Sequence, residues 1–452
     1  MITIKIKYKS ISGDISDHLR EYNNCLRFSY NRLFEGMNNA SLIYREVINK
    51  MNFQLISTFQ VQQCILKAKM ILSSQKDPKV PIVFGGKRNA VLRSQNKITQ
   101  LEYRDKRVQS IWCSGSKDAK GNRYFHLDVI DHHRIVYKAS RSQHFNIELP
   151  KLRNKDLLVL RKLQYLAESK QIPLTFELSK TTICITYDET VFRDVDYQPL
   201  QNRVLSIDSN PNRTGWSVLE FSDDNTFRVV DSGIVEITDI NNLNKNKKLK
   251  SSDPKKIKQT NKRKFEILEI SKFLVEKAKH YQCCKLVCEE LVISSKNHGK
   301  GKNFNKLVNN NWNRNVLFNS LQKRCNITGI ELVFVNPAYT SVIGNAVHGS
   351  DFPDPICAAI EVGRRGFFKY QVGMFYPILT KREVLFDHLW KNGQTKLDFS
   401  DCDDWKSISS KLKTSKTSYR SSVDDFKTTV CSFKSTRSLV QLIELDDFVC
   451  LK

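Results

Sequence analysis

From Val204 onward, the sequence alternates apolar and amphipathic runs in an order that restricts the fold more than any other feature does. Short apolar runs typical of strands cover 204–207, 216–221, 227–230 and 233–237. An amphipathic helix is predicted over 265–280, with Ile267, Ile270, Leu274 and Ala278 along one face. A strand over 286–293, a helix over 316–325, a strand over 330–335 and a helix over 355–364 follow.

The first four runs make three or four strands, and three strands followed by helix, strand, helix, strand and helix is the order of an RNase H-like α/β fold, which we expect over 201–380. In the first part of the chain, residues 2–8 alternate with period two like a strand, and short strands are predicted between 108 and 190. We therefore predict an α+β multidomain protein. Its first part would be a wedge-like β-barrel, over 1–12 and 108–200, that carries a helical insertion over 13–107. Residues 381–452 are predicted to be a polar C-terminal tail rich in Ser, Thr, Lys and Asp, flexible or loosely folded over 407–438 and ending in an apolar piece over 439–451.

The charge of the chain points to a polyanionic partner. Its 452 residues carry a formal net charge of +26, a larger excess than a routine enzyme of small molecules has. Nucleic acid is the commonest partner for such a surface. We predict no membrane partner, since no apolar run approaches the ~20 residues that a membrane span needs. The N-terminus lacks an apolar signal-peptide core, so we expect a cytoplasmic protein, or a nuclear one if the host has a nucleus.

Three acids stand at the end of a predicted strand, inside or at the end of another, and at the start of a predicted helix. Asp208 ends the first strand, Glu289 follows the apolar residues 286–288, and Asp354 precedes the small residues of the last helix. Taken singly, they also fit a turn aspartate, an edge-strand glutamate and a helix N-cap. Together at one sheet edge they would repel one another, and they make sense as ligands of Mg²⁺, which prefers oxygen. Two such ions ~3.5–4 Å apart activate a water and stabilise the leaving oxygen of a phosphodiester.

Two of these acids have a competitor nearby. Because side chains alternate along a strand, only one of Glu289 and Glu290 can face Asp208, and periodicity does not decide which one. Asp351 competes in the same way with Asp354.

Basic residues suited to phosphate contacts lie between and after the acids. The stretch 245–264 holds ten Lys or Arg and one acid, Asp253, and is either a solvated loop or a phosphate-binding segment. Residues 299–302 lack the spacing of a phosphate-binding P-loop and are expected to form a flexible basic loop. Arg364 and Arg365 also fit as cations that stabilise a helix C-terminus. The candidate nucleic-acid-binding residues are Lys245, Lys247, Lys248, Lys250, Lys255, Lys256, Lys300, Lys302, Arg364 and Arg365.

The segments around the three acids resemble a known family. Leu205-Ser-Ile-Asp208, Cys288-Glu289-Glu-Leu291 and Asp354-Pro-Ile-Cys-Ala358-Ala359 are similar to the three RuvC motifs of TnpB-like transposon-encoded nucleases and compact type V CRISPR effectors. The family's second motif favours Glu289 over Glu290, and its third favours Asp354 over Asp351. Segments 336–341 and 360–366 also resemble the family, so the similarity covers about 204–370 and is weaker before 200.

The resemblance implies RNA-guided DNA cleavage at a single RuvC site, made of Asp208, Glu289 and Asp354 with two Mg²⁺ ions, for which Mn²⁺ can substitute. A guide RNA would pair with the target DNA, and the barrel with its insertion would hold the RNA. The resemblance leaves open whether a monomer or a dimer binds one RNA, and it implies a protein encoded by a prokaryote or a phage. The competing interpretations are an unguided RNase H-like transposase or structure-specific endonuclease, and a nucleic-acid-binding regulator with an unused triad.

One feature of the family is missing from this chain. The family carries a zinc ribbon of two cysteine pairs before the last acid, whereas 342–353 contains no cysteine. The twelve cysteines include no C-x-x-C pair, and their spacing fits no zinc template. We therefore expect a reduced target-loading loop over 342–353 and no zinc. The basic stretch would be an insertion over 241–264.

Overall fold

The computed structural model divides the chain into two compact units, Met1–Val191 and Phe192–Lys452. The residues that the structure describes are 1–51, 54–75, 77, 79–140, 142–210, 213–224, 226–237, 253–290, 314–368, 385–387, 389, 397–426 and 430–432. Within these residues, no helix has the length and apolar character that crossing a membrane requires.

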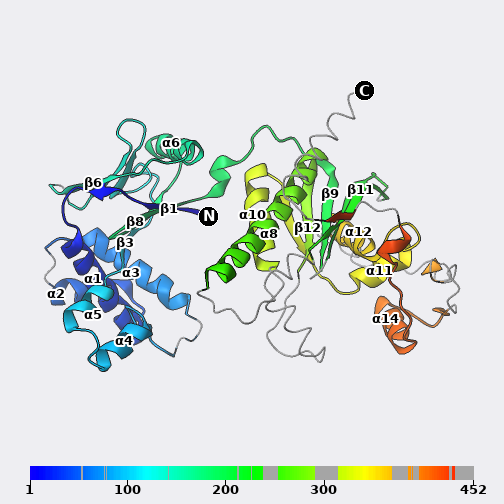
Figure 1. Ribbon diagram of the computed structural model, residues 1–452, viewed down its shortest axis with the longest axis horizontal. Helices are drawn as coiled ribbons and strands as arrows, with labels where there is room; N and C mark the ends of the chain where they lie inside the picture. Colours follow the sequence, from blue (N-terminus) through cyan, green and yellow to red (C-terminus); the bar gives the residue numbers. More distant parts are fainter. Residues whose placement is uncertain are drawn as a thin grey trace. The chain divides into compact units, whose positions relative to one another are not determined.

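The first unit combines two antiparallel sheets with helices (Figure 1). Its strands are β1 (Ile2–Lys7), β2 (Ser10–Ile11), β3 (Ser110–Cys113), β4 (Phe125–Asp128), β5 (Arg134–Lys138), β6 (His144–Glu148), β7 (Thr175–Ser179) and β8 (Thr182–Tyr187). Its helices are α1 (Ser16–Phe34), α2 (Ala40–Lys50), α3 (Thr58–Ser73), α4 (Lys87–Ser94), α5 (Gln100–Lys106) and α6 (Asn154–Glu168), and a 3-10 helix follows at Glu189–Phe192.

The strands of this unit pair in the orders β1-β8-β7-β3 and β2-β6-β5-β4. No pairing among the described strands joins the two sheets, so the structure shows two four-stranded sheets where we expected one closed barrel. Helices α1 to α5 follow β2 and precede β3 in the chain, in the stretch expected to be helical. Helix α6 was missed, although Leu160, Leu163 and Ala167 are buried at helical spacing.

The second unit is built on one six-stranded sheet with the order β13-β12-β9-β10-β11-β14. Its strands are β9 (Leu200–Ser209), β10 (Arg213–Phe221), β11 (Phe227–Glu236), β12 (Cys283–Glu289), β13 (Glu331–Val335) and β14 (Val430–Ser432). Its helices are α8 (Pro254–His280), α10 (Arg314–Thr328), α11 (Thr340–His348), α12 (Asp354–Phe367) and α14 (Trp405–Thr414), with a 3-10 helix at Val423–Asp425. Strands β9, β10 and β11 are antiparallel, whereas β12 is parallel to β9 and to β13.

The order of strands and helices expected for an RNase H-like domain is confirmed, with two differences. The runs 227–230 and 233–237 belong to one strand, β11, and an additional helix, α11, precedes α12. Helices α8 and α10 cover one face of the sheet and α12 covers the other (Figure 1). Leu205 and Ile207 pack toward α8 and α10, whereas Val204 packs toward α12, as the alternation of strand side chains requires.

Two segments that we expected to form loops are partly helical in the structure. Helix α8 begins at Pro254, behind an Asp253 cap that accepts from the Lys255 N–H, so the last part of the basic insertion is helical. Residues 241–252 lie outside the described part. The expected short loop 342–353 is mostly helix α11, which buries Val342, Ile343 and Ala346.

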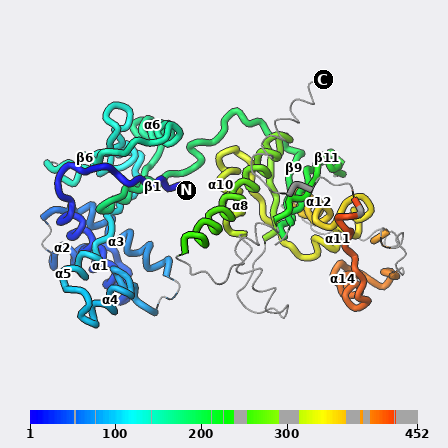
Figure 2. The backbone as a smooth tube through the Cα atoms, viewed as in Figure 1, coloured from blue at the N-terminus to red at the C-terminus, as the bar shows by residue number. Residues whose placement is uncertain are grey.

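The predicted flexible tail is also ordered in its described part. Trp405, Ile408 and Leu412 of α14 are buried with residues of α11 in one apolar cluster. These three residues follow helical spacing, so the signal was present in the sequence. The Ser- and Lys-rich composition around them led to the wrong prediction. The backbone trace shows α11 lying beside α12 (Figure 2).

We expect Gly215→Ala to lower the free energy of unfolding by about 3 kcal/mol or more. A Cβ at Gly215 would lie 2.0 Å from the carbonyl oxygen of Pro355, so the start of α12 would have to move off the sheet. Urea unfolding measures the change. Ser232→Ala, in the neighbouring strand, is the control and should change stability by less than about 0.5 kcal/mol. Equal unfolding midpoints for the two variants would contradict this close packing.

Candidate active site

The carboxyl ends of β9 and β12 bring two acids together at one edge of the sheet. The strands are adjacent and parallel, and Ile207 pairs with Cys288, which places Asp208 and Glu289 at equivalent positions. Both residues follow side chains that pack on the α8 face, so both face α12. Asp208 is 3% exposed and Glu289 is 6% exposed, whereas Glu290 is exposed to solvent.

The third acid reaches the same edge from the first turn of α12. Asp354 is the first residue of this helix, and its side chain is 15% exposed, whereas Asp351 is exposed. The helix start lies close against β10, where Gly215 faces the Pro355 carbonyl. Coulombic repulsion from Glu289 and Asp354 acts on Asp208, so the three carboxylates form one electrostatic cluster.

Each carboxylate of this cluster accepts one hydrogen bond from a neutral side chain. Asn210 Nδ2 donates to Asp208 Oδ2 at 2.6 Å, and Thr340 Oγ1 donates to Glu289 Oε1 at 2.5 Å. Asn345 Nδ2 donates to Asp354 Oδ1 at 2.8 Å. Within the described residues, the second oxygen of each acid has no hydrogen-bond donor. A neutral donor fixes the plane of a carboxylate without cancelling its charge, so the other oxygen can bind a cation.

Burial shifts the titration of all three acids upward. Desolvation raises the pKa of Asp208 well above its usual value, and the charges of Glu289 and Asp354 raise it further. Desolvation also raises the pKa of Glu289 and of Asp354, although hydrogen bonds from Thr340 and Asn345 oppose this rise. Raised pKa values in a group of carboxyl groups are typical of functional sites, because burying these groups costs stability and function is the usual reason for keeping them.

Arg365 supports this site from inside the protein. Its Nε donates to Glu361 Oε1 at 2.7 Å, and its Nη1 donates to the carbonyl oxygens of Asn336 and Ala338 at 2.8 Å. These bonds hold the turn before α11, where Tyr339 has a φ of 63° and Thr340 begins the helix. Arg365 is 1% exposed, so we no longer propose that it contacts nucleic acid.

Arg364 is nearly as enclosed as Arg365. Its side chain is 12% exposed, and its Nε donates to Glu361 Oε2 at 2.8 Å. The observed contacts of Arg364 and Arg365 fit a structural role in the helix better than they fit a phosphate contact. A guanidinium that is buried and bound to a carboxylate has few donors to offer a ligand.

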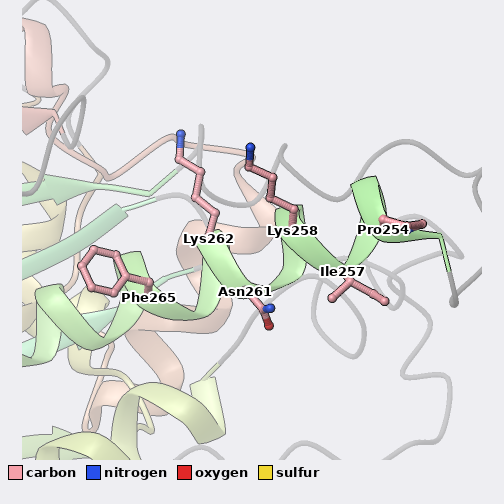
Figure 3. A pocket seen from close by; sticks show the side chains of 6 residues that line it. All are labelled: Pro254, Ile257, Lys258, Asn261, Lys262 and Phe265. Atoms are coloured by element: carbon pink, nitrogen blue, oxygen red, sulfur yellow. The ribbon is translucent and has the colours of Figure 1, made fainter. Parts of the chain in front are cut away.

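The remaining basic candidates divide between described and undescribed residues. Lys245, Lys247, Lys248, Lys250, Lys300 and Lys302 lie outside the described part. Lys255 is exposed and Lys256 is partly exposed in the first turn of α8. A shallow groove follows on the same helix, where Lys258 and Lys262 point to one side and Ile257 and Asn261 to the other (Figure 3).

Two residues near the acids escaped the sequence analysis. Asn345 is fully buried in α11, and Arg420 comes from the segment after α14, with its Nε 3.8 Å from Asp354 Oδ1. The sequence marks Asn345 only weakly, as a polar residue among the apolar residues of its helix. A buried polar side chain needs a hydrogen-bond partner. No local pattern marks Arg420, because its approach to Asp354 depends on how a distant segment folds back.

The acids have the donor set of a site for hard divalent cations, which bind carboxylate oxygens. They do not form the tightest group of such ligands, however. In the described part of the chain, the one group of three His, Cys, Asp or Glu ligand atoms within 4.8 Å of one another is Asp128, Asp131 and His132.

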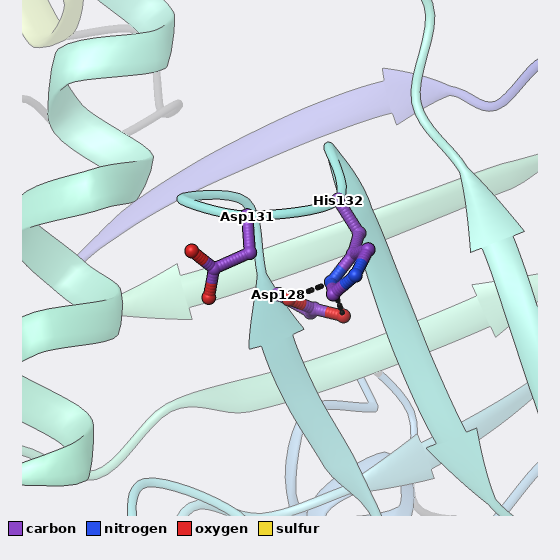
Figure 4. A group of neighbouring side chains, drawn as sticks. All are labelled: Asp128, Asp131 and His132. Atoms are coloured by element: carbon purple, nitrogen blue, oxygen red, sulfur yellow. Dashed lines mark hydrogen bonds and ion pairs between the residues drawn. The ribbon is translucent and has the colours of Figure 1, made fainter.

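The tighter group lies at the turn between β4 and β5 in the first unit (Figure 4). Its donor types suit a metal ion, but Asp128 already has two partners. His132 Nδ1 lies 3.0 Å from it and Arg134 Nε donates to it at 2.8 Å. Asp131 and His132 are exposed. This group is a surface cluster with a local ion pair, and it belongs to a different unit from the three acids.

Comparison with known proteins gives one family match and several structural ones. Residues 1–181 match the family model described as SSO2105 N-terminal domain, which is less than half of the chain. No curated protein matches the sequence.

Among solved structures, RuvC of Thermus thermophilus in complex with a Holliday junction substrate is 11% identical, with a TM-score of 0.26, and the match covers 38% of this chain and 97% of that chain. A Cas12f1–sgRNA–target DNA complex is 12% identical, with a TM-score of 0.41, over 77% of this chain and 82% of that one. A Cas12i–crRNA–dsDNA complex is 11% identical, with a TM-score of 0.27, over 90% and 67%. These scores are too low to establish a shared fold, so the function proposed below rests on the site.

Without divalent metal, Asp208→Asn should be more stable than the wild-type chain, and the difference should grow with pH. The folded pKa of Asp208 is raised above its usual 3.8, so the folded state holds this proton longer than the unfolded state does. Wild-type stability therefore falls as pH rises from about 4 toward the folded pKa, and asparagine removes that part of the fall. Thermal unfolding in EDTA across this range measures it. Asp351→Asn is the control, and parallel curves for Asp208→Asn and wild type would contradict the burial of a charge.

Proposed function

We propose that this protein is a metal-dependent endonuclease whose catalytic residues and metal ligands are Asp208, Glu289 and Asp354. One observation carries the proposal. Two buried carboxylates, from β9 and β12, and the largely enclosed carboxylate of Asp354, from α12, form one electrostatic cluster at the edge of the sheet. A fold gains no stability from clustering buried like charges, and a bound cation relieves their repulsion.

The three acids and the residues that orient them suit phosphodiester hydrolysis. When divalent cations are bound, they activate a water and stabilise the leaving oxygen. The acids supply the ligand oxygens, and Asn210, Thr340 and Asn345 orient them. The turn held by Arg365 keeps Thr340 beside Glu289. We propose Mg²⁺ as the cation, because all three proposed ligands are carboxylates, whose hard oxygen atoms Mg²⁺ prefers.

We further propose that cleavage is guided by an RNA and that the substrate is DNA. The support is the similarity of the motifs around the three acids to those of TnpB-like nucleases and compact type V CRISPR effectors. The net charge of +26 agrees with two nucleic-acid partners. In this proposal the first unit holds RNA, and Lys255 and Lys256 at the start of α8 contact phosphates. An unguided transposase or structure-specific endonuclease is the second candidate, since the same acids and charge would serve it.

The guided and unguided candidates differ in what they bind during expression. We expect the protein, expressed with the DNA that flanks its gene and purified, to carry one abundant RNA that ends in a variable segment. Sequencing the bound RNA measures this. A heterogeneous set of short RNAs that high salt removes would reject the guide and make the unguided nuclease the leading candidate.

The acids are tested by isosteric substitution with matched neighbours as controls. Asp208→Asn, Glu289→Gln and Asp354→Asn should each slow Mg²⁺-dependent cleavage by more than about 100-fold, beyond the 10–100-fold typical of outer-shell partners of a metal. Glu290→Gln and Asp351→Asn change the same functional group at exposed neighbouring positions and should leave the rate unchanged. The substrate is DNA that matches the bound RNA, or branched and single-stranded DNA if no guide is found. Full cleavage by Asp208→Asn would contradict the catalytic role of the acids, whereas a wild-type chain that binds nucleic acid without cutting it, and whose binding Asp208→Asn leaves unchanged, would point to the regulator with an unused triad.

A further inference from the structure

The segment after α14 brings an arginine to the three acids. Arg420 Nε lies 3.8 Å from Asp354 Oδ1, although 66 residues of chain separate the two. This distance exceeds the ~2.7–3.2 Å of a hydrogen bond, so the two groups form an ion pair without a direct bond. The Arg420 side chain is 61% exposed, whereas that of Asp354 is 15% exposed. The guanidinium therefore lies at the mouth of the site and faces solvent.

The backbone of Arg420 is fixed on both sides. On one side, the Tyr419 ring packs on Phe386, with 6.1 Å between ring centroids, at the apolar cluster that joins the tail to α11. On the other side, the Ser421 N–H donates to Asn345 Oδ1 at 3.0 Å, and the Ser421 carbonyl accepts from the Asp354 N–H at 3.2 Å. The amide that orients Asp354 thus also anchors the residue next to Arg420.

Stability does not account for this arrangement. An exposed ion pair of this kind contributes about 0–1 kcal/mol, which is little for a contact anchored at both neighbouring residues. The ion pair would also not persist once a divalent cation binds Asp354, because the cation would repel the guanidinium. Arg420 would then turn to the nearest available anion, and at a nuclease site that anion is a phosphate of the substrate.

We propose that Arg420 is a substrate-binding residue that holds a phosphate of the nucleic acid beside the three acids. The proposal rests on the nuclease function given above and adds a contact from the C-terminal segment, to which the sequence assigned no role. A guanidinium suits this task because its planar fork matches two oxygens of one phosphate, and lysine offers only a point charge. When no substrate is bound, the guanidinium of Arg420 pairs with the carboxylate of Asp354 instead of with a phosphate.

The test compares Arg420→Ala and Arg420→Lys with Arg228→Ala. Arg228 is 74% exposed and pairs with Glu220, which lies on β10 five residues beyond Gly215, the partner of Asp208. The first readout is binding of a single-stranded DNA oligonucleotide over a series of salt concentrations, in an Asp208→Asn background that prevents cleavage. Arg420→Ala should reduce the slope of log affinity against log salt by roughly 0.7, the value for one lost phosphate contact on a single strand. Arg420→Lys should keep the slope, and Arg228→Ala should keep both slope and affinity.

The second readout is cleavage with Mg²⁺ by chains that retain Asp208. Arg420→Ala and Arg420→Lys should both be slower than wild type, because the lysine keeps the charge and loses the fork. Thermal unfolding in EDTA accompanies both readouts. A lower unfolding midpoint of Arg420→Ala with an unchanged salt slope would overturn the proposal, since Arg420 would then only neutralise Asp354.

The two proposals fail in distinguishable ways. A wild-type chain that cuts no DNA, together with a reduced slope for Arg420→Ala, would reject the nuclease and support Arg420 as a phosphate contact. Cleavage by the wild-type chain at the same rate as by Arg420→Ala, with equal slopes, would support the nuclease and overturn the role of Arg420.

Discussion

The second unit is organised around the cost of holding three carboxylates in a buried, shared position. Asp208, Glu289 and Asp354 each lose hydration, and repulsion from the other two adds to the cost at Asp208. No apolar packing offsets such a cost locally. The sheet, the close-packed α12 and the turn before α11 therefore have to hold the acids in place by contacts elsewhere in the unit.

Most of the groups that contact the three acids directly are neutral. Two amides and a hydroxyl orient the carboxylates and leave their negative charge in place. Of the two nearby cations, Arg420 forms a solvent-exposed ion pair with Asp354, and Arg365 lies one layer away. Arg365 binds Glu361 and two carbonyl oxygens and acts on Glu289 through Thr340 and through its own field. Such an arrangement retains affinity for a cation, whereas a direct salt bridge to each acid would have removed it.

The parts of this architecture that follow local periodicity were predictable from the sequence. The strand and helix order of the second unit, and the face of α8 that carries Ile270 and Leu274, follow from hydrophobic spacing. The sheet edge shared by Asp208 and Glu289 follows from parallel pairing. Periodicity could not choose between Glu289 and Glu290, and the structure distinguishes them by burying only Glu289 of the two.

What the sequence did not yield depends on contacts between distant segments. The two sheets of the first unit depend on which strands pair, and alternation alone does not specify partners. The enclosure of Arg365 depends on the turn before α11, and the place of Arg420 depends on a segment whose composition suggested disorder. In each case the decisive partner lies more than 25 residues away in the chain.

The link between Asn345 and Ser421 has a consequence for how the protein is made. Asn345 and Ser421 are 76 residues apart, and the acids themselves extend from 208 to 354. Contacts between such distant residues form late, because the closure of a long loop has to precede them. During synthesis the ribosome releases strands β9 to β13 of the sheet well before it releases the segment around residue 420. The site is therefore completed only after the segment around residue 420 has been made, and a nascent chain that already carries Asp208, Glu289 and Asp354 still lacks the contacts of Arg420 and Ser421.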